Sequence, residues 1–155
     1  MLAHPLDRLS AAEIGHAKRI MVDAGLVTES IRFPMLSLAE PDKREVLTFQ
    51  PGDPIQRAVQ AVLMDATTGA TTQVVVSLTE DRVANTQDVN PAVDGQPPVM
   101  LGEYPTVDEI VKQDQNWLAA MKRRGIDDVT LVCVCPLSAG NYDRPSEAGR
   151  RPSRH

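Results

Sequence analysis

The sequence predicts an α+β fold in which a helix lies on a curled antiparallel sheet, followed by a truncated second copy. The same helix start and stop signals occur twice in the 155 residues. About four strand-like runs follow the first predicted helix, whereas one run and a polar tail follow the second. A helix followed by antiparallel strands buries its apolar stripe on the sheet, which gives an α+β layer pair. We therefore expect one nearly complete module and one cut short.

The first helix is predicted from a capping box at Ser10 and Glu13, where a hydroxyl and a carboxylate satisfy free backbone N–H groups. Leu9 can pack on the first turn as a hydrophobic staple. Gly25 is available for the left-handed conformation that ends many helices. Apolar residues at spacings of three and four form one stripe: Ile14, Ala17, Met21 and Ala24, with Ile20 beside them.

The strand-like runs after this helix cover residues 32–38, 46–49, 57–64 and 71–78. Pro34 favours an edge position for the first run, because proline cannot donate to a neighbouring strand. Residues 51–54 contain two prolines and a glycine, which predicts a break before the third run. Residues 65–69 predict a hairpin loop between the third and fourth runs, and residues 82–84 are a further candidate strand.

Residues 90–98 contain three prolines, a glycine and an asparagine, a combination typical of a connection between domains. The second helix is predicted from another capping box, at Thr106 and Glu109, with Gly125 as its stop. Its apolar stripe includes Trp117, which we interpret as a core anchor. Residues 129–134 predict the strand that follows.

Composition excludes several classes of function. The net charge of −5 argues against nucleic-acid binding. Four arginines near the end of the chain are a local exception: Arg144, Arg150, Arg151 and Arg154. We interpret this basic segment as a frayed terminus. No apolar run approaches the roughly 20 residues of a membrane span, and the first residues lack the features of a secretory signal. Two cysteines are too few for a disulfide framework. We expect a soluble cytoplasmic chain, unless an upstream segment is missing.

Residues with catalytic or metal-binding chemistry are scattered. The three histidines, His4, His16 and His155, form no pair at metal-ligand spacing, so a surface position is expected for each. Cys133 and Cys135 alternate along a predicted strand, where they are poorly placed to bond each other. We interpret them as buried and inert, with a soft-metal pair as the alternative. We therefore expect no catalytic, cofactor-binding or metal residue in this chain.

An ordered set of segments resembles the amino-terminal region of copper-containing amine oxidases. It covers roughly residues 4–142, and the ordered set is more specific than any one of its motifs. The segments are His-Pro-Leu-Asp at 4–7, Ser-Ala-Ala-Glu-Ile at 10–14, Leu-Ala-Glu-Pro-Asp-Lys at 38–43, Gln-Pro-Pro at 96–98, Lys-Arg-Arg-Gly at 122–125 and Val-Cys-Val-Cys-Pro-Leu-Ser-Ala-Gly-Asn-Tyr at 132–142.

The resemblance implies a specific domain organisation. Members of this family carry two small cystatin-like domains ahead of a large β-sandwich catalytic domain. Residues 4–95 resemble the first small domain, residues 98–143 resemble the start of the second, and residues 144–155 form an irregular tail. Because the tail departs from the family pattern, we expect a premature stop or a frameshift. In the full-length family these domains pack on the catalytic domain of a homodimer, so the fragment alone is expected to self-associate.

The resemblance also implies a parent reaction. The family oxidises primary amines to aldehydes, releasing ammonia and hydrogen peroxide, with copper held by three histidines and topaquinone made from a tyrosine. Those groups lie in the catalytic domain, so none is assigned to a residue here. Asn141, Tyr142 and Asp143 imitate the quinone motif but are interpreted as a loop. The alternatives are a free-standing cystatin-like binding module, and an enzyme that uses Tyr142 or the two cysteines with a metal.

Overall fold

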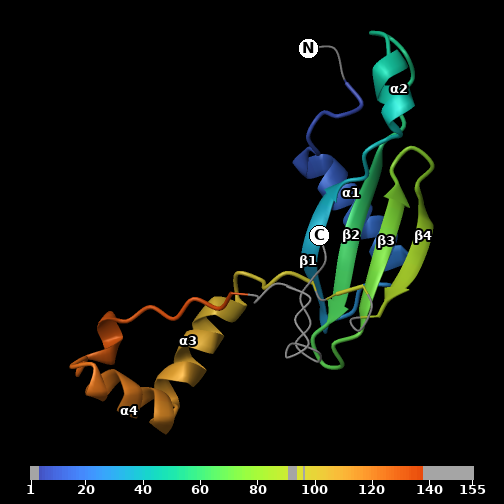
Figure 1. Ribbon diagram of the computed structural model, residues 1–155. Helices are drawn as coiled ribbons and strands as arrows, with labels where there is room; N and C mark the ends of the chain where they lie inside the picture. The colour runs from blue at the N-terminus through green and yellow to red at the C-terminus, as the bar shows by residue number, and fades with distance from the viewer. Residues whose placement is uncertain (1–3, 91–93, 96, 138–155) are drawn as a thin grey trace. The chain divides into compact units, whose positions relative to one another are not determined.

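The computed structural model describes residues 4–90, 94–95 and 97–137. The chain divides into two compact units, Met1–Pro97 and Pro98–His155. In the described part, the first unit contains two helices and a four-stranded sheet, and the second contains helices only (Figure 1). None of the described helices is both long enough and apolar enough to span a membrane.

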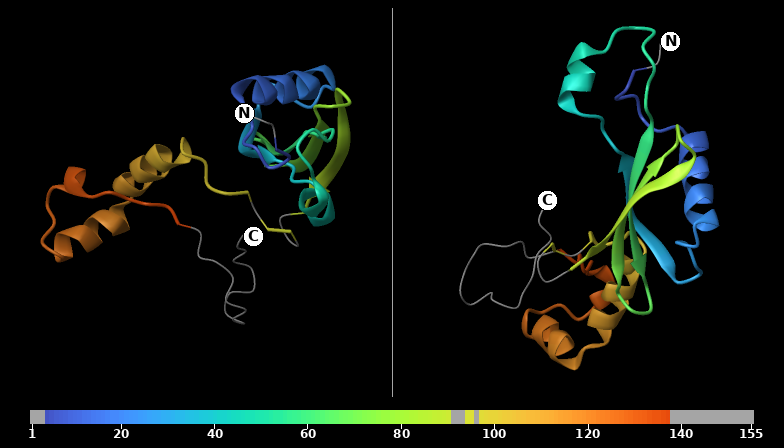
Figure 2. Two further views of the ribbon diagram at one scale, coloured as in Figure 1. Left: turned by 90° about the horizontal axis from the view of Figure 1, so that it is seen from above. Right: turned by 90° about the vertical axis from the view of Figure 1, so that its right-hand side faces the viewer.

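The first unit is built on an antiparallel meander. The strands pair in chain order and form an open sheet: β1 (Ile31–Leu38), β2 (Ala58–Asp65), β3 (Thr71–Ser77) and β4 (Arg82–Val89). Helix α1 (Ala11–Asp23) lies across one face of this sheet, while the other face carries no helix of the unit (Figure 2). The predicted α+β fold class, a helix on a curled antiparallel sheet, is confirmed.

Helix α1 begins and ends as its sequence signals predict. The Ser10 Oγ accepts the backbone N–H of Glu13 at 3.2 Å, and the Glu13 carboxylate accepts the backbone N–H of Ser10 at 2.8 Å. At the other end Gly25 has a φ of +72°, and Leu26 donates its N–H to the Met21 carbonyl at 2.9 Å. These bonds satisfy backbone groups that a helix terminus leaves free.

Strand β1 matches its predicted edge position, and strand β4 is longer than predicted. Strand β1 is an edge strand, and its register with β2 shifts between Arg32 and Met35, where Pro34 lies. Strand β4 continues to Val89, well past the predicted residues 82–84. It is an edge strand with mostly exposed residues, so it lacks the apolar alternation from which a strand is predicted.

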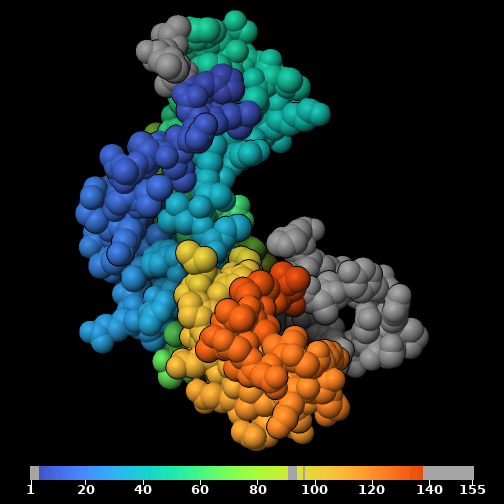
Figure 3. Space-filling model, turned by 90° about the vertical axis from the view of Figure 1, so that its left-hand side faces the viewer, coloured from blue at the N-terminus to red at the C-terminus, as the bar shows by residue number. Residues whose placement is uncertain are grey.

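The segment predicted as the second strand, residues 46–49, is mostly helical. Helix α2 (Lys43–Thr48) begins after Asp42, whose side chain accepts the Arg44 N–H at 2.8 Å. Leu47 is 72% exposed, so no sheet covers this apolar side chain. The N-terminal segment lies beside the connection that carries α2 (Figure 3), and the rings of His4 and Phe49 meet edge-on with centroids 5.3 Å apart.

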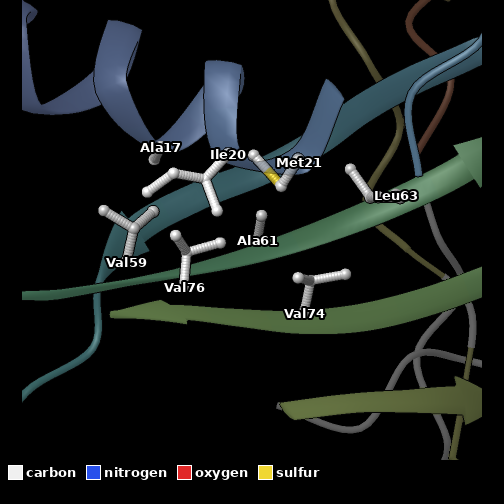
Figure 4. Close-up of a cluster of buried hydrophobic side chains, with 8 residues drawn as sticks. All are labelled: Ala17, Ile20, Met21, Val59, Ala61, Leu63, Val74 and Val76. Carbon is white, nitrogen blue, oxygen red and sulfur yellow. The ribbon is translucent and has the colours of Figure 1, made fainter. Parts of the chain in front are cut away.

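The core of the first unit lies between α1 and the central strands, whose alternate residues point at the helix (Figure 4). Its members are Ala17, Ile20 and Met21 on α1, Val59, Ala61 and Leu63 on β2, and Val74 and Val76 on β3. Each large side chain buried here stabilises the fold by about 1.5–3 kcal/mol. Ile14 is 40% exposed and Ala24 is exposed, so the ends of the predicted stripe do not face the sheet.

The second unit contains α3 (Glu103–Gln113), α4 (Gln115–Arg123) and the 3₁₀ helix η1 (Val129–Leu131). The predicted single helix is therefore interrupted. Asp114 leaves helical geometry with a ψ of 122°, and its carboxylate caps α4 by accepting the Trp117 N–H at 2.7 Å. Trp117 is half-buried, and α3 and α4 contain no buried residue.

Two further predictions for this unit are wrong. Thr106 lies inside α3, because the helix already begins at Glu103, so it forms no capping box. The strand predicted at residues 129–134 is η1 followed by irregular backbone. Asp128 favours the 3₁₀ turn by accepting the Thr130 N–H at 3.0 Å, and the described residues of this unit provide no partner strand. The stop at Gly125 is confirmed, with a φ of +76°.

Candidate functional site

Arg57, which immediately precedes β2, makes several polar contacts at once. Its Nε donates to the Glu13 Oε1 at 2.7 Å, and the two side chains are only 17% and 27% exposed. Because Glu13 lies in the first turn of α1, this ion pair joins the start of the helix to the start of a central strand.

The same guanidinium also holds the N-terminal segment. Arg57 Nη1 donates to the carbonyl oxygens of Pro5 at 3.1 Å and Asp7 at 2.9 Å, and Nη2 donates to Arg8 O at 3.4 Å. Arginine presents five donors in a fixed planar fork, which suits it to several acceptors at once. One side chain therefore ties the start of β2 to the N-terminal segment and to the first turn of α1, both of which lie more than 40 positions away in sequence.

The Glu13 carboxylate is strongly stabilised as the anion. The hydrogen bond from Arg57 and the backbone N–H of Ser10 lower the pKa of Glu13 from 4.5 to about 2. A carboxylate with so low a pKa cannot take up a proton near neutral pH, so it is unsuited to general acid–base catalysis. The geometry assigns Arg57 and Glu13 a structural role.

A hollow of about 380 Å³ opens beside this cluster, between the N-terminal segment and the connection that carries α2. Its apolar wall consists of Pro5, Pro41, Phe49, Pro54 and Ile55. Glu45 and Asp53 add two carboxylates to the rim, and Asp53 accepts the Gln50 N–H at 2.8 Å. The volume lies within the range of small-molecule sites, so the hollow is the candidate binding site of the first unit.

The described histidines serve separate local contacts. His4 Nδ1 accepts the Leu6 N–H at 3.1 Å. His16 Nε2 lies 2.6 Å from Asp81 Oδ1, which joins α1 to the turn between β3 and β4. The sequence did not reveal this pair, and a φ of +54° at Asp81 marks the turn that makes it. His155 lies outside the described residues.

The cysteines do not lie where they were predicted. Cys133 and Cys135 are exposed free thiols on irregular backbone, and their sulfur atoms are 3.6 Å apart. The prediction that they are buried in a strand is therefore wrong, because that strand is absent. Asn141, Tyr142, Asp143 and the four terminal arginines lie outside the described residues.

Residues 10–86, which span α1 and most of the sheet, match the AGAO-like N2 domain family. They form an AGAO-like N2 domain. The chain is 42% identical over 150 residues to histamine oxidase from Arthrobacter globiformis, an alignment that covers 96% of this chain and 21% of the relative. It is 33% identical over 150 residues to copper methylamine oxidase from Arthrobacter sp. (strain P1), covering 97% and 22%.

A solved structure supports the fold of this chain. The copper-containing benzylamine oxidase from Hansenula polymorpha superposes with a TM-score of 0.61 at 17% identity, over 77% of this chain and 19% of that one. The chain thus spans about a fifth of the length of the relatives it matches. It corresponds to the amino-terminal region of copper amine oxidases, which confirms the resemblance seen in the sequence.

Copper methylamine oxidase and the copper-containing benzylamine oxidase carry copper in their names, so we ask whether the residues of this chain could form a copper site. In a copper site that is held by several histidines, the side chains of those histidines must converge on the metal ion. In residues 4–90, 94–95 and 97–137, no group of three histidine, cysteine or acidic side chains is placed to hold a metal ion. The described residues of this chain therefore do not fit a histidine-bound copper centre.

Proposed function

We propose that this chain is the amino-terminal part of a copper- and topaquinone-dependent primary-amine oxidase, and that it is non-catalytic by itself. The parent reaction converts a primary amine, oxygen and water into an aldehyde, ammonia and hydrogen peroxide. The observation that carries the proposal is the alignment to histamine oxidase, which runs over 150 residues but covers only 21% of that enzyme.

The chemistry of the described side chains supports a non-catalytic role. An active site needs a nucleophile, a base or an electrophile within hydrogen-bond reach of one reacting atom. Here the Arg57 guanidinium is occupied by Glu13 and by backbone carbonyls, and the low pKa of Glu13 removes it as a base near neutral pH. His16 is engaged with Asp81.

We further propose that the chain packs on the catalytic domain of a homodimeric enzyme. Large apolar side chains of the second unit are exposed and would be covered there: Leu101, Ile110, Leu131 and Leu137. Alone, the chain would self-associate through the same residues. A cytoplasmic location belongs to this proposal, because both cysteines are free thiols and reduced thiols persist in that compartment. No role with nucleic acids or membranes is proposed.

A free-standing binding module is the second candidate function. The hollow beside Phe49, with a volume of about 380 Å³, favours it. A module for apolar ligands would have few charges at such a site, whereas this rim carries Glu45 and Asp53. The amine oxidase proposal accounts for the whole alignment, so we place it first.

A turnover assay tests the leading proposal. The purified chain is incubated with Cu²⁺ in air and then assayed for hydrogen peroxide with histamine and with methylamine. Full-length histamine oxidase from Arthrobacter globiformis is the positive control. We expect no peroxide above the buffer rate from this chain. Amine-dependent peroxide release that scales with chain concentration would contradict the proposal.

A further inference from the structure

Two exposed thiols lie side by side in the second unit. The sulfur atoms of Cys133 and Cys135 are 3.6 Å apart, and neither cysteine takes part in a disulfide. We propose that these two thiols form a bidentate site for a soft divalent cation of the zinc class. The proposal is independent of the amine oxidase function.

The distance between the sulfur atoms fits chelation. Zinc–thiolate bonds are about 2.3 Å long and prefer tetrahedral angles. Two such bonds to sulfur atoms 3.6 Å apart enclose an angle of roughly 103°, since half the separation divided by the bond length gives the sine of half the angle. The thiols therefore need little movement to bind one ion together.

The same distance shows that the two thiols are in the reduced state. A disulfide requires a sulfur–sulfur distance of about 2.05 Å. Cys133 and Cys135 would have to close by roughly 1.5 Å from their present 3.6 Å, across a single intervening residue. Chelation leaves the sulfur atoms close to their present separation, whereas oxidation requires them to approach each other.

The residue between the two cysteines is fixed to a helix. Asp108 Oδ1 on α3 accepts the Val134 N–H at 3.0 Å, and Asp108 Oδ2 accepts from Lys112 Nζ at 2.9 Å. These contacts hold the backbone that presents both thiols on one side. The carboxylate of Asp108, which bonds the residue between the two cysteines, also places a negative charge near the thiols, and this charge favours a cation.

Binding involves no oxidation or reduction. Each thiol releases its proton to water, and two sulfur–metal bonds form, so the two thiolates neutralise the divalent charge. In the part of the chain that the structure describes, no third histidine, cysteine or acidic ligand joins them. Water would fill the remaining positions, and the ion would exchange more readily than in a four-ligand structural site.

Cadmium titration of the reduced full-length chain tests the site. Cd²⁺ bound to thiolates gives an ultraviolet charge-transfer band, and the chain has only two cysteines, so all of that signal must come from this pair. We expect one Cd²⁺ per monomeric chain, with protection of both thiols from a thiol-modifying reagent. Calorimetry of the same titration gives the affinity and the stoichiometry.

Two isosteric variants, Cys133→Ser and Cys135→Ser, make the test specific. Each should lose at least about tenfold in Cd²⁺ affinity and about half of the charge-transfer band, with an unchanged circular dichroism spectrum because both side chains are exposed. The control His16→Asn, which removes a histidine in the other unit, should bind Cd²⁺ like the unaltered chain. Equal affinity in either serine variant, or one ion shared by two chains, would overturn the proposal.

Discussion

Arg57 and Glu13 form an ion pair across 44 positions of sequence, with 2.7 Å between Nε and Oε1. The pair links the capping box of α1 to the beginning of β2, and the spare donors of Arg57 bind the carbonyls of the N-terminal segment. Glu13 thus belongs both to the local capping box and to a tertiary ion pair. The loss of this pair should therefore lower the free energy of unfolding of the first unit.

Removal of the guanidinium should destabilise the first unit markedly. Arg57→Ala leaves the poorly exposed Glu13 carboxylate without its cation and several carbonyls without a donor. We expect a loss of roughly 2–4 kcal/mol in the free energy of unfolding, measured by urea titration. The matched control is Arg82→Ala, whose ion pair with Glu80 is mostly exposed and should contribute under about 1 kcal/mol. Equal losses in the two variants would show that Arg57 does not have the role assigned to it.

The Glu13 pKa predicts how stability varies with pH. Because the folded-state pKa is lowered from 4.5 to about 2, the contribution is complete above about pH 4.5 and is lost as the pH falls towards 2. The shift corresponds to at most about 3 kcal/mol, and less in practice since the side chain keeps 27% exposure. Urea unfolding between pH 7 and pH 3 should show a steeper decline for the unaltered chain than for Glu13→Gln. Parallel declines would contradict this cause of the shift.

Two substitutions at Asp81 distinguish the cost of its backbone conformation from the contribution of its bond to His16. Asp81 has a φ of +54° and bonds His16 at 2.6 Å. Asp81→Ala keeps the unfavourable backbone and loses the bond, so we expect a loss of about 1–2 kcal/mol. Asp81→Gly also loses the bond but relieves the backbone, so its stability should lie close to that of the unaltered chain. Thermal melts compare the two variants, and a glycine variant no more stable than the alanine variant would refute the argument from strain.

The position of the core under α1 predicts that two truncations of apolar side chains have very different effects on the free energy of unfolding. Met21 is fully buried between α1 and the sheet, so Met21→Ala should cost about 2–5 kcal/mol in unfolding free energy. Leu47 on α2 is 72% exposed, and Leu47→Ala should change the stability by under about 0.5 kcal/mol. Chemical denaturation of both variants measures the difference, and similar losses would mean that the core lies elsewhere.

Local signals in the sequence predicted local structure well. The Ser10–Glu13 box and the stops at Gly25 and Gly125 need only neighbouring residues, and the structure has all three. The second capping box failed because Glu103 already begins α3, with its carboxylate accepting the Met100 N–H at 2.6 Å. A capping motif three residues inside an established helix has no free N–H groups to satisfy.

Non-local contacts could not be predicted in the same way. His16 and Asp81 are 65 positions apart, and Arg57 is 44 positions from Glu13, so no spacing in the sequence indicates either pair. Through these contacts, polar residues of α1 bond the start of β2 and the turn between β3 and β4. Residues 46–49 were predicted as a strand, but the Asp42 side chain caps a helix over most of this segment, and no sheet covers Leu47.

The central functional claim is that this chain carries no reaction centre of its own. Labelling of quinone carbonyls with phenylhydrazine tests this claim most directly. The purified chain is incubated with Cu²⁺ in air and then with phenylhydrazine, which labels quinone carbonyls, and labelled peptides are mapped by mass spectrometry. The chain has two tyrosines, Tyr104 and Tyr142. We predict no adduct on either of them. A stoichiometric phenylhydrazine adduct on Tyr142 would contradict the account.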